Sequence, residues 1–222
     1  MTEITNEARV FVYGASGHGK VVADILQARG IRVEGFIDDD SSKPRTLLGL
    51  KVLGDGNWLV DQAADQPLIV ALGIGDNFAR RTVMNRYTTV NIRFFTAVHP
   101  TATVAASAKI YSGSVVMARA VINPDAVIGR GAIINTGAIV EHDCRIGDFA
   151  HLSPNVAVGG HAQVGDFSWL GIGSVLIHGA KVGSGSIIGA GAAVVRDIGD
   201  WVVAIGTPAR VLRAIQPRTQ GH

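Results

Sequence analysis

From Val98 onward, an aliphatic residue returns at every sixth position of the chain. The series reaches Val194 without a change of phase, and every member is Ile, Val or Leu. The residue two positions earlier is in most cases Ala or Ser, and Gly follows the aliphatic residue at several points. A period of six fits neither the 3.6-residue repeat of an amphipathic helix nor the alternation of an ordinary strand. It is typical of a parallel β-helix, in which three hexapeptides form one triangular coil.

The N-terminal third follows another pattern, in which apolar strands alternate with helices. Strands are expected at residues 9–13, 32–37 and 68–72, and helices at about 20–29 and 78–87. This alternation predicts a small Rossmann-like parallel sheet. The two patterns meet near His99 and Pro100. We therefore expect an α/β domain over residues 1–97 and a β-helix with a short C-terminal tail over residues 98–222.

Composition narrows the class of protein. The chain has 222 residues, one cysteine and a net charge of +2, which predicts no disulfide framework and no basic stripe for nucleic acid. Its N-terminus lacks the basic and then apolar order of a signal peptide. No uncharged apolar run approaches the roughly 18 residues of a membrane helix. These features predict a cytoplasmic protein that neither binds nucleic acid nor inserts into a membrane.

A glycine-rich turn at residues 14–19 follows the first strand, and an acidic cluster at residues 38–40 follows the second. This context favours a nucleotide, because backbone N–H groups at the start of a helix bind phosphates and a carboxylate binds the ribose or base. The spacing G-x-x-G-x-G departs from the dinucleotide form G-x-G-x-x-G, which argues against NAD. The alternative is a structural turn beside solvated acids.

His142 lies two residues after Val140, where its side chain is expected to point outward. Residues 18 positions apart should stack on adjacent coils, about 4.8 Å from one another. Gly160 should therefore leave space beside the His142 imidazole, and His161 should lie over Asp143 and pair with it. An exposed histidine flanked by acids suits a general base. The alternative is a solvated histidine at a corner.

Four histidines of the β-helix raise the question of a metal: His142, His151, His161 and His178. Some trimeric β-helix proteins are zinc-dependent carbonic anhydrases whose ligands include two His separated by four residues, and these four histidines show no such spacing. We expect no metal. The stacking rule also places Trp169 over His151.

Seven short motifs, taken in order, resemble one family. They are residues 13–19 (Tyr-Gly-Ala-Ser-Gly-His-Gly), 37–39 (Ile-Asp-Asp), 74–77 (Ile-Gly-Asp-Asn), 135–136 (Asn-Thr), 141–143 (Glu-His-Asp), 149–151 (Phe-Ala-His) and 206–209 (Gly-Thr-Pro-Ala). With this set the chain resembles the nucleotide-amino-sugar N-acetyltransferases of bacterial surface-glycan pathways, which are related to sialic-acid O-acetyltransferase-like proteins. The hexapeptides resemble those of left-handed β-helix acyltransferases, which implies a left-handed coil.

The resemblance implies a homotrimer in O-antigen or lipopolysaccharide biosynthesis, with acetyl-CoA in the groove between neighbouring β-helices. The N-terminal domain would hold the nucleotide of a UDP- or GDP-linked amino sugar. The residues implied for the nucleotide sugar are Gly14, Ser16, Gly17, His18, Asp38, Asp39, Gly75, Asn77 and Asn135. Those implied for the coenzyme A groove are His151, Gly160, His161, Ile172, Ala190, Thr207, Pro208 and Ala209.

The expected reaction is acetylation of the 4-amino group of a 4-amino-4,6-dideoxy sugar, such as that of GDP-perosamine. His142 would remove the amine proton, Asp143 would hold its tautomer, and the N–H of Gly160 would stabilise the oxyanion. Many relatives have Glu at the position of Asp143.

Three other functions were weighed. A sugar O-acetyltransferase of the sialic-acid branch fits the same residues. A non-catalytic nucleotide-sugar sensor is disfavoured by the intact Glu-His-Asp, and a Rossmann oxidoreductase by the glycine spacing. The sequence does not decide whether the sugar is linked to UDP or GDP, or whether the acetyl group goes to nitrogen or oxygen. It also leaves open the sugar stereochemistry, the position of the amine and the glycan that receives the product.

Overall fold

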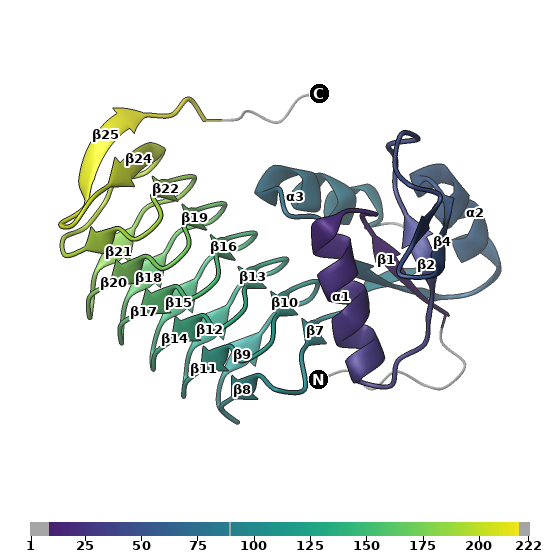
Figure 1. Cartoon of the computed structure of the whole chain (residues 1–222), viewed down its shortest axis with the longest axis horizontal. Helices are drawn as coiled ribbons and strands as arrows, with labels where there is room; N and C mark the ends of the chain where they lie inside the picture. Colours follow the sequence, from purple (N-terminus) through teal and green to yellow (C-terminus); the bar gives the residue numbers. More distant parts are fainter. Residues whose placement is uncertain (1–8, 89, 218–222) are drawn as a thin grey trace.

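The computed structural model describes residues 9–88 and 90–217, which form an α/β domain followed by a β-helix (Figure 1). The α/β domain has a six-stranded sheet in the order β3-β4-β2-β1-β5-β6, parallel except for the antiparallel pair β3–β4. Its strands are β1 (Arg9–Tyr13), β2 (Val33–Ile37), β3 (Thr46–Leu47), β4 (Leu50–Gly54), β5 (Leu68–Leu72) and β6 (Ile92–Phe94). The expected parallel sheet is confirmed, and β3, β4 and β6 extend it.

Three helices cover this sheet: α1 (Gly17–Ala28), α2 (Gly56–Asp65) and α3 (Asn77–Arg86). α1 begins three residues before its expected start, directly within the glycine-rich turn, and α2 had no expected counterpart. Asp55 and Asp76 cap α2 and α3, because each side chain accepts two backbone N–H groups of the first turn. Ser16 makes no such bond at the start of α1.

Helix α1 lies between the sheet and the β-helix. One apolar face of the sheet, the buried side of α1 and the outer face of the first coils share one buried cluster, in which Leu26 and Val115 are both fully shielded. α2 and α3 pack on the other face of the sheet. α3 also contacts the β-helix through Phe78, whose ring stacks on Phe167 with centroids 5.0 Å apart. The two parts therefore share a continuous apolar interface.

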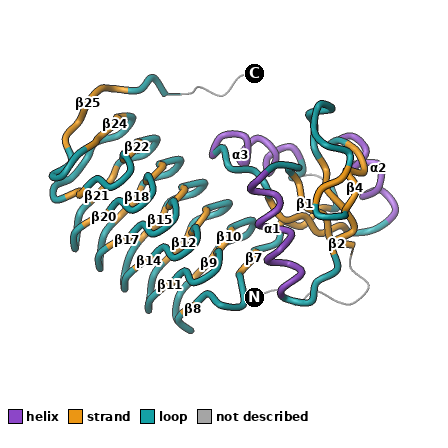
Figure 2. The backbone as a smooth tube through the Cα atoms, in the orientation of Figure 1, coloured by secondary structure: helices purple, strands orange, loops and turns teal. Residues whose placement is uncertain are grey.

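The β-helix consists of two-residue strands separated by turns, and each strand ends on one of the predicted aliphatic residues (Figure 2). The strands are β7 (Ala97–Val98), β8 (Thr103–Val104), β9 (Lys109–Ile110), β10 (Val115–Val116), β11 (Val121–Ile122), β12 (Val127–Ile128), β13 (Ile133–Ile134), β14 (Ile139–Val140), β15 (Arg145–Ile146), β16 (His151–Leu152), β17 (Ala157–Val158), β18 (Gln163–Val164), β19 (Trp169–Leu170), β20 (Val175–Leu176), β21 (Lys181–Val182), β22 (Ile187–Ile188) and β23 (Ala193–Val194).

These strands form three parallel sheets, one for each side of a triangular, left-handed prism. The first sheet holds β7, β10, β13, β16, β19 and β22, and the second holds β8, β11, β14, β17, β20 and β23. The third holds β9, β12, β15, β18 and β21. Pairing joins each residue to the residue 18 positions later, as in Val115 with Ile133, so the predicted stacking is confirmed.

The corners explain the rest of the hexapeptide. From Gly113 to Gly191 the second turn residue of each hexapeptide has a left-handed φ, for example 60° at Asp125, 59° at Asp143 and 59° at His161. Glycine occupies many of these positions because it adopts that conformation without steric cost. Bulkier residues also occur there, including Phe149 and Phe167, so stacking along the prism outweighs the local preference.

A hairpin of β24 (Val202–Ile205) and β25 (Arg210–Ala214) follows the last coil, and β24 pairs with β22. It extends the first sheet at the C-terminal end of the prism (Figure 1). None of the helices in the described ranges has the length and apolar character needed to cross a membrane.

Candidate functional site

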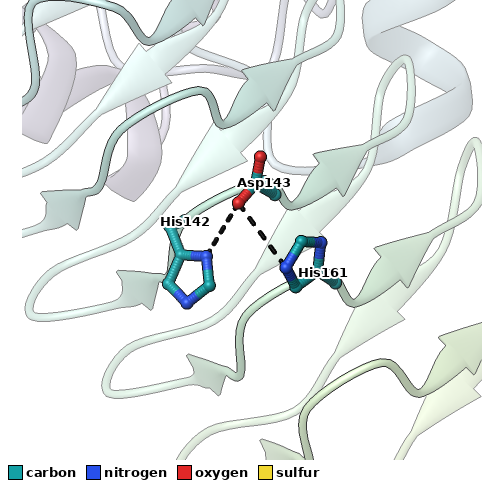
Figure 3. Close-up of side chains that lie close together, drawn as sticks. All are labelled: His142, Asp143 and His161. Atoms are coloured by element: carbon teal, nitrogen blue, oxygen red, sulfur yellow. Dashed lines mark hydrogen bonds and ion pairs between the residues drawn. The ribbon is translucent and has the colours of Figure 1, made fainter.

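The candidate catalytic pair lies at the corner between the second and third sheets (Figure 3). Nδ1 of His142 is 2.8 Å from Oδ2 of Asp143. This hydrogen bond holds the pKa of the Asp143 carboxyl below its usual value, so the ionised carboxylate acts only as an acceptor. Nδ1 of His142 therefore carries a hydrogen, which leaves Nε2 of a neutral imidazole as an acceptor. Both side chains are nearly half exposed, so a substrate can reach them.

Gly160 lies directly over the His142 ring, as the stacking rule predicts. A Cβ at Gly160 would lie 2.6 Å from Nε2 of His142, closer than real contacts allow. The N–H of Gly160 donates to no described residue. Pro124 and Pro154 occupy the equivalent position at other corners, which shows that the fold needs no hydrogen bond there. The His142 imidazole therefore occupies the place that a side chain at residue 160 would take, and the N–H of Gly160 stays a free donor.

His161 lies on the other side of the pair. Its Nε2 is 3.6 Å from Oδ2 of Asp143, so the expected contact is present. Its ring meets the rings of both His142 and His178 edge-on, at 5.1 Å and 5.2 Å between centroids. The ligand atoms of His142, Asp143 and His161 lie within 4.8 Å of one another, which makes this exposed group the candidate metal cluster of the described chain.

The glycine-rich turn is built for close approach of backbones. Gly14 has φ of 113°, and a Cβ there would lie 2.6 Å from the carbonyl oxygen of Gly73. Gly17, the first residue of α1, is exposed with open space where a Cβ would stand. Ser16 precedes it without capping the helix. The first N–H groups of α1, at the carboxyl edge of the sheet, therefore receive no side-chain cap from Ser16.

Asp38 and Asp39, both expected to bind the nucleotide, accept hydrogen bonds from the protein itself at this edge of the sheet. Oδ2 of Asp38 accepts the N–H of Ala15 at 2.7 Å, which holds the glycine-rich turn against β2. Asp39 accepts the N–H of Gly56 at 2.9 Å and also bonds the Tyr13 hydroxyl and the Arg86 guanidinium. These contacts keep the pKa of Asp39 below its usual value in spite of partial burial. Asp39 therefore already has partners from β1, α2 and α3.

Three polar residues meet where the α/β domain touches the first sheet. The ring of His18 lies 6.4 Å from that of His151, which stacks flat on Trp169 as expected, at 5.5 Å. Nε2 of His151 is 3.1 Å from the amide nitrogen of Asn135. Burial and the nearby Arg80 charge lower the pKa of His18 to about 4 and of His151 to about 3. Both imidazoles are neutral at physiological pH, and each keeps one shielded nitrogen without a partner among the described residues.

Arg80, which the sequence analysis did not single out, organises this junction. It is fully buried and donates to the carbonyl oxygens of Gly131 at 2.8 Å and Phe149 at 2.9 Å in the β-helix. It also donates to the carbonyl of Gly75 and the side chain of Asn77. Burial lowers its pKa to about 9. No sequence signal distinguishes Arg80 from the adjacent Arg81.

Asn77 and Gly75, both expected near the nucleotide, are held by this network. The amide of Asn77 donates to the carbonyl oxygen of Phe167 at 2.9 Å, so the side chain links α3 to the β-helix. The carbonyl of Gly75 faces Arg80, while its Cα faces open space.

Seven of the eight residues expected in the coenzyme A groove fall at two corners of the chain, and the eighth, His151, is instead buried in strand β16 of the first sheet. Ile172, Ala190 and Thr207–Ala209 follow strands of the first sheet and share one corner, where Ile172 is 59% exposed. Gly160 and His161 lie at the corner between the second and third sheets. One chain therefore does not bring the two groups together.

Comparisons with known proteins agree with both halves of the chain. Residues 9–87 match the family model of the PglD N-terminal domain, and residues 161–196 match the bacterial transferase hexapeptide model. A UDP-N-acetylbacillosamine N-acetyltransferase of Bacillus subtilis (strain 168) is 38% identical over 113 residues. That match covers 49% of this chain and about half, 51%, of the curated relative.

Solved structures match almost the whole chain. A perosamine N-acetyltransferase (PerB) from Caulobacter crescentus, solved with CoA and GDP-perosamine, is 39% identical with a TM-score of 0.87, covering 92% of this chain and 97% of that one. The acetyltransferase domain of PglB from Neisseria gonorrhoeae, solved with acetyl coenzyme A, is 36% identical with a TM-score of 0.86, covering 92% and 98%.

Proposed function

The chain belongs to the nucleotide-amino-sugar N-acetyltransferases, and we propose that it transfers the acetyl group of acetyl-CoA to the 4-amino group of a UDP- or GDP-linked 4-amino-4,6-dideoxy sugar. The observation that carries this proposal is the half-exposed His142–Asp143 pair, whose imidazole packs against Gly160 on a β-helix that follows an α/β domain. An amine acceptor and an acyl thioester need little more than a base and precise placement.

His142 acts as the general base. A sugar amine is largely protonated near neutral pH and must lose a proton before it can attack. Because Nδ1 is bonded to Asp143, Nε2 is the nitrogen that accepts this proton. The lone pair of the amine then forms a bond to the thioester carbonyl carbon. The missing side chain at Gly160 lets the His142 imidazole take this position.

The N–H of Gly160 stabilises the oxyanion of the resulting tetrahedral intermediate, because it is free and adjacent to the base. The C–S bond then breaks, and the proton held by His142 passes to the thiolate. The attacking nitrogen still carries one proton more than an amide nitrogen, and it releases this proton to water. The products are the amide and coenzyme A, with His142 neutral again. No metal ion takes part in these steps.

The sugar nucleotide binds with its phosphates at the uncapped start of α1, where Gly14 and Gly17 let a ligand approach the backbone. His18, His151 and Asn135 lie beside this edge and offer neutral polar atoms to the sugar or its phosphates. The named relatives act on differently linked sugars, GDP-perosamine in one and a UDP-linked sugar in the other.

The active enzyme is a homotrimer in which neighbouring chains share each site. The corner that carries His142 is opposite the first sheet, on which the α/β domain rests. The two groups of coenzyme A residues also lie at different corners. Two adjacent prisms would bring them face to face across one groove, so that the sugar held by one chain reaches His142 of its neighbour.

An acceptor panel tests the proposed activity. Release of coenzyme A thiol is followed with acetyl-CoA and UDP- and GDP-linked 4-amino-4,6-dideoxy sugars, with the matching 4-hydroxy sugars as controls. Turnover confined to a single amino sugar supports N-acetylation and shows whether the substrate carries uracil or guanine. Turnover of a hydroxy sugar alone assigns the chain to O-acetylation, and a lack of turnover with every acceptor contradicts both.

A further inference from the structure

A cavity of about 700 Å³ opens at the end of the β-helix nearest the chain start. Its walls come from both parts of the molecule: Phe94 and Phe95 at the end of the sheet, and the first coil of the prism. The proposed reaction uses none of the residues that line it. Its volume lies within the range of small-molecule sites in proteins.

The first coil forms an apolar floor for this cavity. Val98, Val104 and Ile110 are the inward aliphatic residues of that coil, and all three line the cavity. In later coils such residues are covered by the coil before, as with the fully buried Val116. The first coil has no predecessor, so its three aliphatic side chains stay only partly buried. An apolar ligand group would cover them, which is favourable.

The wall opposite carries positive charge. Arg29, at the end of α1, and Arg93, in β6, both line the cavity, and no Asp or Glu is among the described residues that do so. Nη1 of Arg29 is shielded from solvent and has no hydrogen-bond partner in the described chain. Its guanidinium lies over the Phe95 ring, 5.4 Å from the centroid. Nη1 itself is closed to a ligand, but Arg29 lines the cavity and carries further N–H groups, so an anion in the cavity would be stabilised by its charge.

We propose that this cavity binds an amphipathic anion, a molecule with an alkyl or aryl body and one carboxylate or phosphate group. The body lies on the aliphatic side chains of the first coil. The anionic group accepts hydrogen bonds from Arg29, with Arg93 as the second positive charge. A charge-assisted bond to a guanidinium is among the strong polar contacts in proteins.

The cavity is distinct from the proposed acetyl-transfer site. α1 runs from the glycine-rich turn to Ala28, so Arg29 lies about 18 Å from that turn by the rise of an α-helix. His142 lies beyond the first coil, at a corner of later coils. Binding here can therefore be measured on its own, whatever the protein acetylates.

Isothermal titration calorimetry of the full chain with octanoate, octyl phosphate and 1-octanol tests the proposal. We expect both anions to bind and the uncharged alcohol, with the same chain length, to bind at least about tenfold more weakly. Arg29→Gln should weaken the anions by about tenfold and leave the alcohol unchanged. Arg93→Gln alters an exposed side chain that contributes little to folding, and it should weaken the anions in the same direction.

Arg196→Gln is the matched control, because Arg196 is equally cationic and exposed but lies at the far end of the prism. Its anion affinity should equal that of the unmodified protein. Equal binding of octanoate and octanol, or unchanged anion affinity in both the Arg29 and Arg93 variants, overturns the proposal. A change of oligomeric mass in the Arg29 variant also overturns it, since the cavity would then be an interface between chains.

Discussion

Two adjacent arginines in α3 show how far residue-level roles depend on surroundings. Arg80 is fully buried and donates to backbone carbonyls of both domains, whereas Arg81 lies over the rings of Phe78 and Phe167. The buried cation lies next to His18 and His151 and adds to the desolvation that keeps them uncharged. Arg80 is therefore a positioning residue for the junction where the sugar nucleotide is proposed to bind.

The lowered pKa of His151 makes stability depend on pH. Its value is about 3 in the folded protein against an ordinary 6.5, so only the unfolded chain takes up this proton as the pH falls below about 6.5. The contribution of the neutral His151 to the free energy of unfolding is fully present above that pH and is lost on acidification. The loss is on the order of 2 kcal/mol per such histidine between about pH 7.5 and about pH 5.

Urea unfolding at the two pH values, at one protein concentration, checks this. His151→Gln should lose less stability on acidification than the unmodified protein. His178→Gln, which alters an exposed histidine, should lose as much as the unmodified protein. Equal losses in all three proteins would contradict a buried neutral His151.

Replacement of the proposed base gives a direct test at the residue scale. His142→Asn should lower kcat by about 10²-fold or more, because general-base catalysis contributes in that range. The Kd of acetyl-CoA should change little, since the side chain acts on the amine. Steady-state kinetics and equilibrium binding measure the two quantities. A kcat near that of the unmodified enzyme would remove His142 from the base role.

The histidine cluster also gives a prediction about metals. Since the proposed proton transfers need only His142, dialysis against EDTA should leave kcat unchanged. Zn²⁺ added afterwards should inhibit, because His142, Asp143 and His161 together can bind it and occupy Nε2. Loss of activity on chelation, with recovery on adding one particular metal, would contradict a metal-free reaction.

At the scale of elements, the 18-residue period places the candidate catalytic residues next to one another at the corners of the β-helix. His142, Gly160 and His178 occupy one column of turn positions, and Asp143 and His161 occupy the next. Stacking therefore places a glycine over the proposed base and a second histidine over the carboxylate, although each pair is distant along the chain. The rigid parallel pairing of the coils holds them in place.

Gly160→Ala tests the role of the missing side chain at residue 160. A Cβ would meet Nε2 of His142 at 2.6 Å, so the imidazole must move away from its position. We expect kcat to fall by about tenfold or more while the urea midpoint stays close to that of the unmodified protein. Gly199→Ala is the control, because a Cβ there meets no atom within 4 Å and φ is ordinary. Equal kcat in the two variants would contradict that role.

At the scale of the whole molecule, α1 anchors the α/β domain on one face of a three-sided prism. His18, at the start of α1, lies near His151 of the first sheet, while the proposed base lies at the corner opposite that sheet. A stiff prism cannot bring these places together within one chain. The proposed association of identical chains would do so.

Mixed trimers check this arrangement. His142→Asn removes the base, and Gly17→Glu places a carboxylate at the start of α1, where it repels phosphates but favours the helix. Each variant alone should be inactive. Chains co-expressed in equal amounts should recover about a quarter of full activity. At random, that fraction of sites takes an intact His142 from one variant and an intact start of α1 from the other. No recovery in proven mixed assemblies would place both halves in one chain.

The local pattern of the sequence accounts for a large part of this fold. The hexapeptide phase predicted every strand from Val98 to Val194 and the stacking of Gly160 on His142, because a strictly repeated coil converts sequence spacing directly into distance. The βαβ alternation predicted β1, β5 and the parallel sheet for a similar reason. It did not predict α2 or the C-terminal hairpin, whose apolar residues follow no clear period.

What the sequence by itself determined is therefore the periodic part: the prism, the sheet, and the neighbours of His142. The tertiary structure alone decided which arginine of α3 is buried, that Asp39 and Asn77 are held by partners within the chain, and that Arg29 lines a cavity. The reason is physical. Contacts within a repeat depend on a constant rise per coil, whereas these contacts depend on how α1 and α3 pack against the prism, and no local period encodes that packing.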